Sequence, residues 1–336
     1  MGEPAPASPS DPTARATDLA DAAVAGDRRA LARLLTAVEN RTPVAEAAMR
    51  RLYPMAGRAH LVGITGPPGS GKSTLVAAMI ERVRAAGRPV GVVAVDPSSP
   101  ITGGALLGDR VRMQAYAGDR DVFIRSMASR GHAGGLASTS TAAAAVLDAA
   151  GFDLILIETV GTGQSEVEVA AAADTTVVLE APEMGDEVQA IKAGLLEVAD
   201  LVVVNKGDKP GALRTAAQLR AMLVAGASPK VGAGQARPKR PEVLVTTAAT
   251  GDGVEELLAA IDRHRETGRG GSSAEARLAR AEAQVWAILA DRLRASLHEA
   301  AHAETTRATL SEVAEHRLDP YAAADRLLAV LGADGS

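Results

Sequence analysis

Short apolar runs alternate with helical stretches through the centre of the chain. The runs are rich in Val, Ile and Leu on both faces, as are strands of a parallel sheet that is covered on both sides. We expect strands at Leu61–Thr65, Val90–Val95, Leu154–Ile157, Thr176–Leu179, Leu201–Val204 and Val243–Val245, with Val122–Ile124 as a further candidate. Helices are expected near residues 73–86, 136–150, 186–198, 211–224 and 253–266. This alternation predicts an α/β fold whose mostly parallel sheet lies between helices.

The two ends of the chain follow other patterns. The first residues are rich in Pro, Ala and Ser, which predicts disorder, and the next stretch has apolar positions at helical spacing with a break at Gly26-Asp27. Beyond the central domain, a Gly-rich joint precedes two further expected helices, at 274–300 and 320–331. The predicted parts are therefore a tail (1–15), an N-terminal helical extension (16–57), a central domain (58–268) and a C-terminal helical arm (269–336).

Two segments of this layout leave alternatives open. The helix expected at 274–300 carries an apolar stripe that includes Leu278, Val285 and Leu289. This stripe either packs against its own domain or forms a dimer arm. Residues 225–241 are rich in Gly, Pro and basic residues, which is typical of a surface insertion.

Composition excludes several kinds of function. Aromatic residues make up 2% of the chain and the net charge is -5, which disfavours a nucleic-acid surface. Cysteine is absent, so disulfides, thiolate zinc sites and cysteine nucleophiles are excluded, and a reducing cytoplasm is expected. We find no signal peptide and no run of 18 apolar residues, so no membrane segment is expected.

A phosphate-binding loop follows the first expected strand. The motif G-x-x-x-x-G-K-[ST] is matched between this strand and a helix, which is the context that the motif requires. Its glycines let backbone N–H groups turn toward phosphate oxygens, and the helix N-terminus adds positive potential. The expected nucleotide-binding residues are Gly66, Pro67, Pro68, Gly69, Ser70, Gly71, Lys72, Ser73 and Thr74.

Three side chains of this loop have expected roles. Lys72 should reach the β- and γ-phosphates, the Ser73 hydroxyl should ligate Mg²⁺, and Thr74 is placed to contact the α-phosphate. The loop alone indicates a nucleoside triphosphate without choosing its base.

Acidic residues at the ends of two other expected strands point to the same crevice. Asp96 is a candidate for holding Mg²⁺ through water or for orienting the attacking water. Glu158 ends an apolar run in the Walker B pattern and would hold the metal shell. The N–H of Gly161 is expected to sense the γ-phosphate, because glycine allows the closest backbone approach.

A Gly-rich stretch leads to Asp109, Arg110 and Arg112, which have the composition of a switch segment ordered by the triphosphate. Asp109 is a second candidate for the metal shell. An arginine supplied in cis would stabilise transition-state charge, while the alternative for each arginine is a surface role.

Guanine recognition is indicated by Asn205-Lys206-Gly207-Asp208, an N-K-x-D tetrapeptide after an expected buried strand. The Asp208 carboxylate can accept hydrogen bonds from guanine N1–H and from its exocyclic N2 amine, and adenine lacks both the N1 proton and the N2 donor. Lys206 would cover the base, and Asn205 would tie loops together. After the last strand, Thr247, Ala248 and Ala249 form the expected second contact, with the Ala248 N–H facing guanine O6.

Taken together, these segments resemble the MeaB/ArgK family of GTPases associated with methylmalonyl-CoA mutase. The matching text is GITGPPGSGKSTL, VAVDPSSPITGGALLGDRVRM, SMASRGHAGGL, ETVGTGQSEVEVA and GDEVQAIKAGLLEVADLVVVNKGD. The resemblance implies a homodimeric chaperone that uses GTP, GDP and Mg²⁺ to gate cofactor loading of an adenosylcobalamin-dependent acyl-CoA mutase. It also implies slow intrinsic hydrolysis that the partner raises. Glu187, Gln189 and Lys192 are candidates to relay the nucleotide state to that partner.

Two departures and two alternatives accompany this resemblance. In the first departure the chain has NKGD and Thr247-Ala248 where the family often has NKAD and Ser-Ala, and in the second its insertion at 225–241 is longer and more basic than expected for the family. The alternatives are a metal-insertion GTPase, which would need a His or Cys cluster, and an ATP-using small-molecule kinase of the ArgK type, which would need no N-K-x-D.

Overall fold

The structure is a computed structural model. It describes residues 12–96, 116, 118–128, 135–159, 173–182, 196, 198–225, 241–268 and 273–333. The chain divides into two compact units, Met1–Ala276 and Arg277–Ser336.

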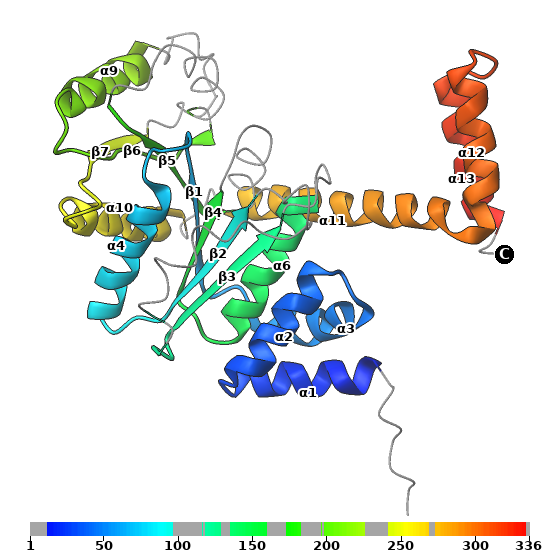
Figure 1. The fold of residues 1–336 in the computed structure, drawn as a ribbon, viewed down its shortest axis with the longest axis horizontal. Helices are drawn as coiled ribbons and strands as arrows, with labels where there is room; N and C mark the ends of the chain where they lie inside the picture. The colour runs from blue at the N-terminus through cyan, green and yellow to red at the C-terminus, as the bar shows by residue number, and fades with distance from the viewer. Residues whose placement is uncertain are drawn as a thin grey trace, which may run out of the picture. The chain divides into compact units, whose positions relative to one another are not determined.

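A parallel sheet of seven strands forms the centre of the first unit (Figure 1). The strands are β1 (His60–Thr65), β2 (Val90–Asp96), β3 (Val122–Ala128), β4 (Leu154–Thr159), β5 (Thr175–Glu180), β6 (Leu201–Val204) and β7 (Glu242–Val245). Their order is β3-β2-β4-β1-β5-β6-β7, and every described pair is parallel. The predicted fold class is therefore confirmed. The candidate strand at Val122 is longer than expected and runs to Ala128.

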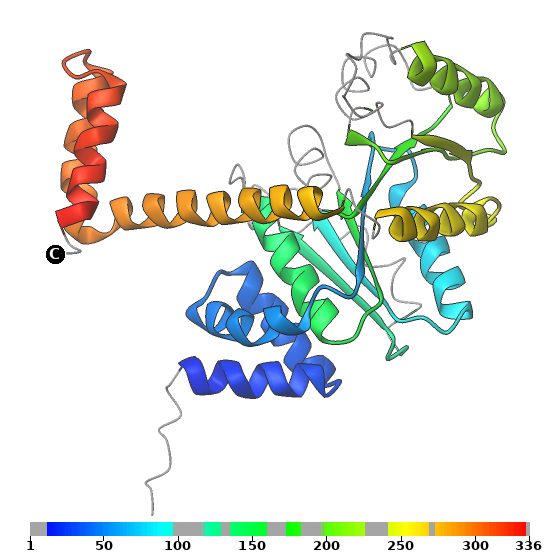
Figure 2. The same ribbon diagram turned by 180° about the vertical axis from the view of Figure 1, so that it is seen from behind.

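Helices cover both faces of this sheet (Figures 1 and 2). Successive strand residues point to opposite faces, so Val62, Ile64 and Leu156 pack with α4 and α10, whereas Val93 and Ile157 pack with α6 and the N-terminal helices. On that second face, α9 packs against β6 and β7. The covering helices are α4 (Lys72–Ala85), α6 (Gly135–Ala149), α9 (Ala212–Ala225) and α10 (Val254–Gly268). Most of the helix expected at 186–198 and of the insertion at 225–241 lies outside the described residues.

The N-terminal extension belongs to the core of the first unit. It comprises α1 (Pro12–Val24), α2 (Arg28–Glu39), α3 (Pro43–Leu52) and the 3₁₀ turn Tyr53–Met55. Buried Leu34 and Leu35 of α2 share one apolar cluster with residues of β3 and α6. The Arg28 guanidinium donates to the carbonyl oxygens of Asp119, Arg120 and Val122 and lies over the Phe123 ring. Helix α1 begins at Pro12, so residues 12–15 are helical rather than part of the expected tail.

The second unit is helical. It contains most of α11 (Ser273–His298), together with α12 (Ala300–Ala314) and α13 (Pro320–Ala333). Helices α12 and α13 pack on each other and are joined by the Arg326–Glu312 ion pair. The Thr306 hydroxyl donates to the Leu297 carbonyl oxygen, which fixes α12 against the end of α11. Sequence patterning did not predict α12.

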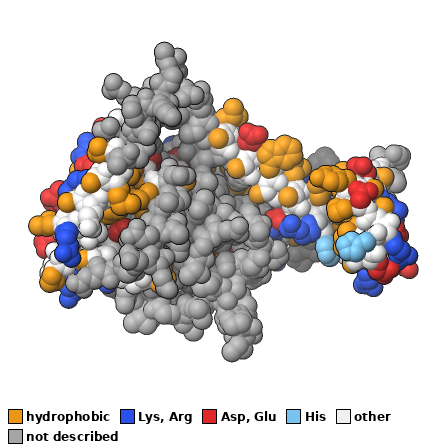
Figure 3. Space-filling view, turned by 90° about the horizontal axis from the view of Figure 1, so that it is seen from above, with side chains coloured by type: hydrophobic (Ala, Val, Ile, Leu, Met, Phe, Trp, Pro, Cys, Tyr) orange, Lys and Arg blue, Asp and Glu red, His pale blue; other side chains and the backbone are white. Residues whose placement is uncertain are grey.

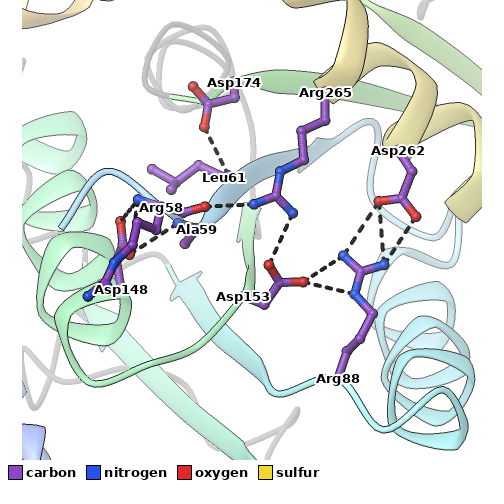
Figure 4. A network of polar contacts seen from close by, with 9 residues as sticks. All are labelled: Arg58, Ala59, Leu61, Arg88, Asp148, Asp153, Asp174, Asp262 and Arg265. Atoms are coloured by element: carbon purple, nitrogen blue, oxygen red, sulfur yellow. Dashed lines mark hydrogen bonds and ion pairs between the residues drawn. The ribbon is translucent and has the colours of Figure 1, made fainter. Parts of the chain in front are cut away.

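A network of charged side chains lines the amino ends of the strands (Figure 4). The buried Asp148 carboxylate at the end of α6 accepts from the backbone N–H groups of Gly57, Arg58 and Ala59, just before β1. Arg88 and Arg265 both donate to Asp153. Burial alone would raise the pKa of the Asp153 carboxyl, but these hydrogen bonds outweigh it and lower that pKa below its ordinary value.

Arg265 and Arg88 also connect α10 to this edge of the sheet. Arg265 donates to the Arg58 carbonyl oxygen, and Arg88 donates to Asp262, one turn earlier in α10. The last turns of α10 are therefore held against the amino ends of β1 and β4.

Next to this network, a buried hydroxyl joins two histidines. The Thr175 Oγ1 lies 2.8 Å from His60 Nε2 and 2.6 Å from His264 Nδ1, while His264 Nε2 lies 3.5 Å from Asp200. Burial lowers the pKa of His60 to about 4, because the charged imidazole cannot be hydrated there. The nearby Arg265 and His264 act in the same direction, whereas Asp174 and Asp262 oppose it.

We predict that His60 makes the fold acid-sensitive. Its pKa is lower in the folded state than the 6.5 of a free imidazole, so the unfolded chain binds the proton more readily. The contribution of the neutral His60 side chain to the free energy of unfolding is fully present above pH 6.5. It is lost as the pH falls toward 4, by about 3 kcal/mol in all. In denaturant unfolding, the free energy of unfolding should fall less between pH 7 and pH 4 for His60→Gln than for the unaltered protein.

The control for this measurement is His298→Gln, which removes an exposed histidine of α11. Its free energy of unfolding should fall between pH 7 and pH 4 as much as that of the unaltered protein. An equal fall in His60→Gln would contradict the prediction.

Candidate functional site

The candidate site lies at the carboxyl ends of β1, β4, β6 and β7. The loop between β1 and α4 needs glycine at its first position for two reasons. Gly66 has a φ of 141°, and a Cβ there would lie 2.3 Å from the Leu179 carbonyl oxygen of β5. The loop therefore passes directly over β5 before α4 begins at Lys72. Gly69 and Gly71 of the same loop also have positive φ angles.

The Lys72 side chain turns back into this loop. It is 7% exposed, and its ammonium donates to the carbonyl oxygens of Gly66 at 2.6 Å and Pro67 at 3.1 Å. The cation is thus held at the N-terminus of α4, where the helix dipole already creates positive potential. This combination favours an anion.

Ser73 and Glu158 meet although 85 residues separate them. Ile64 at the end of β1 lies opposite Glu158 of β4, which brings the start of α4 close to that carboxylate. The Ser73 hydroxyl donates to Glu158 Oε1 at 2.6 Å, and the Glu158 side chain is fully buried. A hydroxyl beside a buried carboxylate at this place is the donor set that P-loop proteins use for Mg²⁺. Both predicted residues therefore fit the metal.

The Asn205 side chain joins two loops at the end of β6. Its amide nitrogen donates to the Ser70 carbonyl oxygen at 2.9 Å. Its amide oxygen accepts from the Ala248 N–H at 3.0 Å and from the Thr246 hydroxyl at 3.2 Å. The phosphate loop and the loop after β7 are therefore fixed to one buried side chain.

The remaining predicted base-contact residues lie around Asn205. Lys206 and Asp208 are exposed, and Lys206 has the left-handed φ of 58°. Ala248 is buried, whereas Ala249 is exposed beside it. Thr74 occupies the first turn of α4, and Pro68 is exposed at the tip of the phosphate loop.

Several predicted residues cannot be placed. Asp96 is the last residue of β2, which pairs with β4, but its side chain is not described. The others lie outside the described residues: Gly161 and the segment with Asp109, Arg110 and Arg112, and the relay candidates Glu187, Gln189 and Lys192.

Two threonine hydroxyls at strand ends make contacts for which the sequence predicted no role. The Thr246 hydroxyl helps to hold Asn205, and the Thr159 hydroxyl contacts Thr65 at 3.3 Å between β4 and β1. The only signal for either was a threonine at the end of an apolar strand, which is common in strands of any function.

Among the residues that the structure describes, no group of three or more His, Asp or Glu side chains could hold a metal ion. A magnesium site of the expected kind needs no such group, since Mg²⁺ is bound by one or two side chains together with phosphates and waters. None of the described helices is both long and apolar enough to cross a membrane.

Comparison with known proteins agrees with this arrangement. A Pyrococcus abyssi protein named as a GTPase is 47% identical over 308 residues, which cover 90% of this chain and 93% of that protein. A mouse protein named methylmalonic aciduria type A homolog, mitochondrial, is 36% identical over 248 residues, covering 70% of this chain and 59% of its own.

A solved structure described as LAO/AO transport system kinase is similar over 95% of this chain and 98% of its own, with a TM-score of 0.66 and 27% identity. The family model described as methylmalonyl Co-A mutase-associated GTPase MeaB matches residues 31–302. The chain therefore belongs to the MeaB family of GTPases.

Proposed function

We propose that the site binds GTP across the loops that Asn205 joins. Phosphates would lie against residues 66–74, and guanine between Lys206, Asp208 and the Ala248 N–H. The observation that carries this proposal is the Asn205 side chain, which bonds both to the phosphate loop and to the predicted base-contact loop. The Ser70 hydroxyl adds support, because it is buried and its oxygen has no partner among the described residues. A phosphate oxygen would be a suitable acceptor for it.

GTP hydrolysis would use the charged groups at the carboxyl edge of the sheet. Lys72 and the N-terminal N–H groups of α4 would stabilise charge on the β- and γ-phosphates. Ser73 and Glu158, with Asp96 or Asp109, would hold Mg²⁺, which when bound neutralises phosphate charge. The Gly161 N–H would contact the γ-phosphate. Loss of the γ-phosphate on hydrolysis would release the segment that carries Arg110 and Arg112.

Replacement of Lys72 by Ala should abolish tight GTP binding. The substitution removes the one ammonium that lies inside the phosphate loop, and a charge-assisted hydrogen bond to phosphate is lost with it. Titration calorimetry with GTP and Mg²⁺ should show at least about a hundredfold weaker binding. Lys209→Ala, at an exposed lysine of the same edge, is the control and should bind normally. Unchanged affinity in Lys72→Ala would reject the assignment.

The partner that we propose is an adenosylcobalamin-dependent acyl-CoA mutase. Family membership supports this, since the matching family is described as methylmalonyl Co-A mutase-associated. The protein would gate cofactor loading and protect the mutase, with GTP hydrolysis slow until the mutase binds. Glu187, Gln189 and Lys192 would relay the nucleotide state. A cytoplasmic location is part of the same proposal.

Stimulated hydrolysis tests the partner directly. In the presence of Mg²⁺, phosphate release from GTP should be slow for the protein alone and at least about tenfold faster with the correct mutase from the same cell. The reason is that the partner would complete the catalytic arrangement. If no such mutase changes the rate, the chaperone role is wrong although the GTPase remains.

The control for this experiment is Asp208→Asn. Its amide donates where the carboxylate only accepts, so this variant should favour xanthine nucleotides. Mutase stimulation of the variant with XTP but not with GTP would show that the stimulation follows nucleotide binding.

We also propose that α11 contributes to a homodimer. Apolar side chains gather along this helix (Figure 3). They are exposed in the single chain: Leu278, Val285, Trp286, Ile288, Leu289 and Leu293. Val285 and Leu289 are four residues apart and so lie on one face of the helix. Several exposed apolar side chains on one helix are typical of an interaction site.

Two glutamates on that face should separate the dimer. Light scattering should give twice the chain mass for the unaltered protein and the single-chain mass for Val285→Glu/Leu289→Glu, because each charge would be buried at the interface. Ala283→Glu on another face is the control. Trp286 is the only tryptophan, so its emission should shift to longer wavelength only on separation. A double variant that keeps twice the mass would contradict this proposal.

A further inference from the structure

We infer that Gly207 is a positioning residue for guanine recognition. The side chains of Val245 and Thr247 occupy the space that a side chain at position 207 would need. The three residues would then set the distance between the tetrapeptide at 205–208 and the loop at 246–248. The inference rests on the proposed binding of GTP.

Backbone conformation does not explain the glycine at this position. Gly207 is absent from the glycines with positive φ, whereas its neighbour Lys206 has a φ of 58°. The strained turn is therefore made by a lysine, and the backbone of residue 207 is one that any amino acid adopts. The family often has alanine here, so the requirement for glycine comes from the neighbours in this chain, which has Thr247 where the family often has serine.

The surroundings leave no room for a methyl group. A Cβ at position 207 would lie 2.9 Å from Val245 Cγ1, 3.1 Å from the Thr247 hydroxyl oxygen and 3.3 Å from the Thr246 carbonyl oxygen. Contacts this short force the neighbours to move. Val245 and Thr247 are both branched at Cβ, so their side chains have few other rotamers available.

Hydrogen bonds hold the two segments together at this point. The Gly207 N–H donates to the Thr246 carbonyl oxygen at 2.9 Å, and the Thr246 N–H donates to the Val204 carbonyl oxygen at 3.0 Å. A methyl group at position 207 would push against these bonds and displace the loop after β7. The Ala248 N–H, held by Asn205 at 3.0 Å, would move with it relative to Asp208.

Each of the two predicted guanine contacts directly follows one of the crowded residues. Asp208 follows Gly207 directly, and Ala248 follows Thr247 directly. A change in their separation would weaken guanine binding more than phosphate binding, because the contacts of Lys72 and Ser73 involve neither segment and, in the part of the chain that the structure describes, only Asn205 joins the phosphate loop to them. The expected defect is therefore one of base selection.

The test is a comparison of GDP and IDP binding. IDP lacks the exocyclic amine that Asp208 would accept from, so the GDP-to-IDP affinity ratio reports the position of that carboxylate. Gly207→Ala should bind GDP about tenfold more weakly, in line with one methyl group added to a packed site. Its affinity for inorganic pyrophosphate should fall by less than its affinity for GDP, and its GDP-to-IDP affinity ratio should fall.

A compensating variant makes the inference specific. Val245→Ala removes the nearest obstructing atom, so Gly207→Ala/Val245→Ala should bind GDP within about threefold of Val245→Ala alone. This comparison also decides the case if Gly207→Ala alone does not fold. Gly332→Ala is the matched control, because a Cβ there meets nothing within 4 Å.

The outcomes separate this inference from the proposed function. If the unaltered protein does not bind GDP, the proposed function fails and the inference fails with it. If it binds and prefers GDP but Gly207→Ala keeps the same affinity and ratio, the inference alone is overturned. A double variant at least about tenfold weaker than Val245→Ala would overturn it as well.

Discussion

The amide of Asn205 is the interaction on which the candidate site depends. One planar group donates to the phosphate loop and accepts from the loop after β7, so a single buried residue sets the distance between two otherwise separate segments. A buried amide is costly unless its partners are in place. The carboxyl edge of the sheet is therefore organised around a polar contact, whereas apolar packing on both faces supplies the support beneath it.

The strands were predictable because their physical cause is local. A strand buried on both faces must be apolar throughout, and Leu201–Val204 shows that pattern so clearly that its bounds match the prediction. Helix α12 lacks such a signal, since its buried positions are His302, Thr306 and Thr309 rather than a stripe of large apolar residues. Proline at the first turn marks the start of α1, but in a stretch rich in Pro, Ala and Ser it indicated disorder instead.

The candidate site was predictable to a similar extent. Motif spacing predicted that Lys72, Ser73, Glu158 and Asn205 share one edge of the sheet, because each lies at or just beyond the carboxyl end of a parallel strand. The pairing of Ser73 with Glu158 depends on the strand order, and the crowding around Gly207 depends on how two loops pack. Neither can be read from one segment, because both arise from contacts between residues far apart in the chain.

The order of the strands also bears on how the chain assembles during synthesis. Strand β4 lies between β1 and β2, so β1 has no neighbour to pair with until residue 159 has been made, although β2 can pair earlier with β3. The extension α1–α3 emerges first, yet the surface that it covers includes α6, which ends at Ala149. Nearly half of the chain must therefore leave the ribosome before its first helices find their final neighbours, and the N-terminal segment is a natural client for chaperones in that interval.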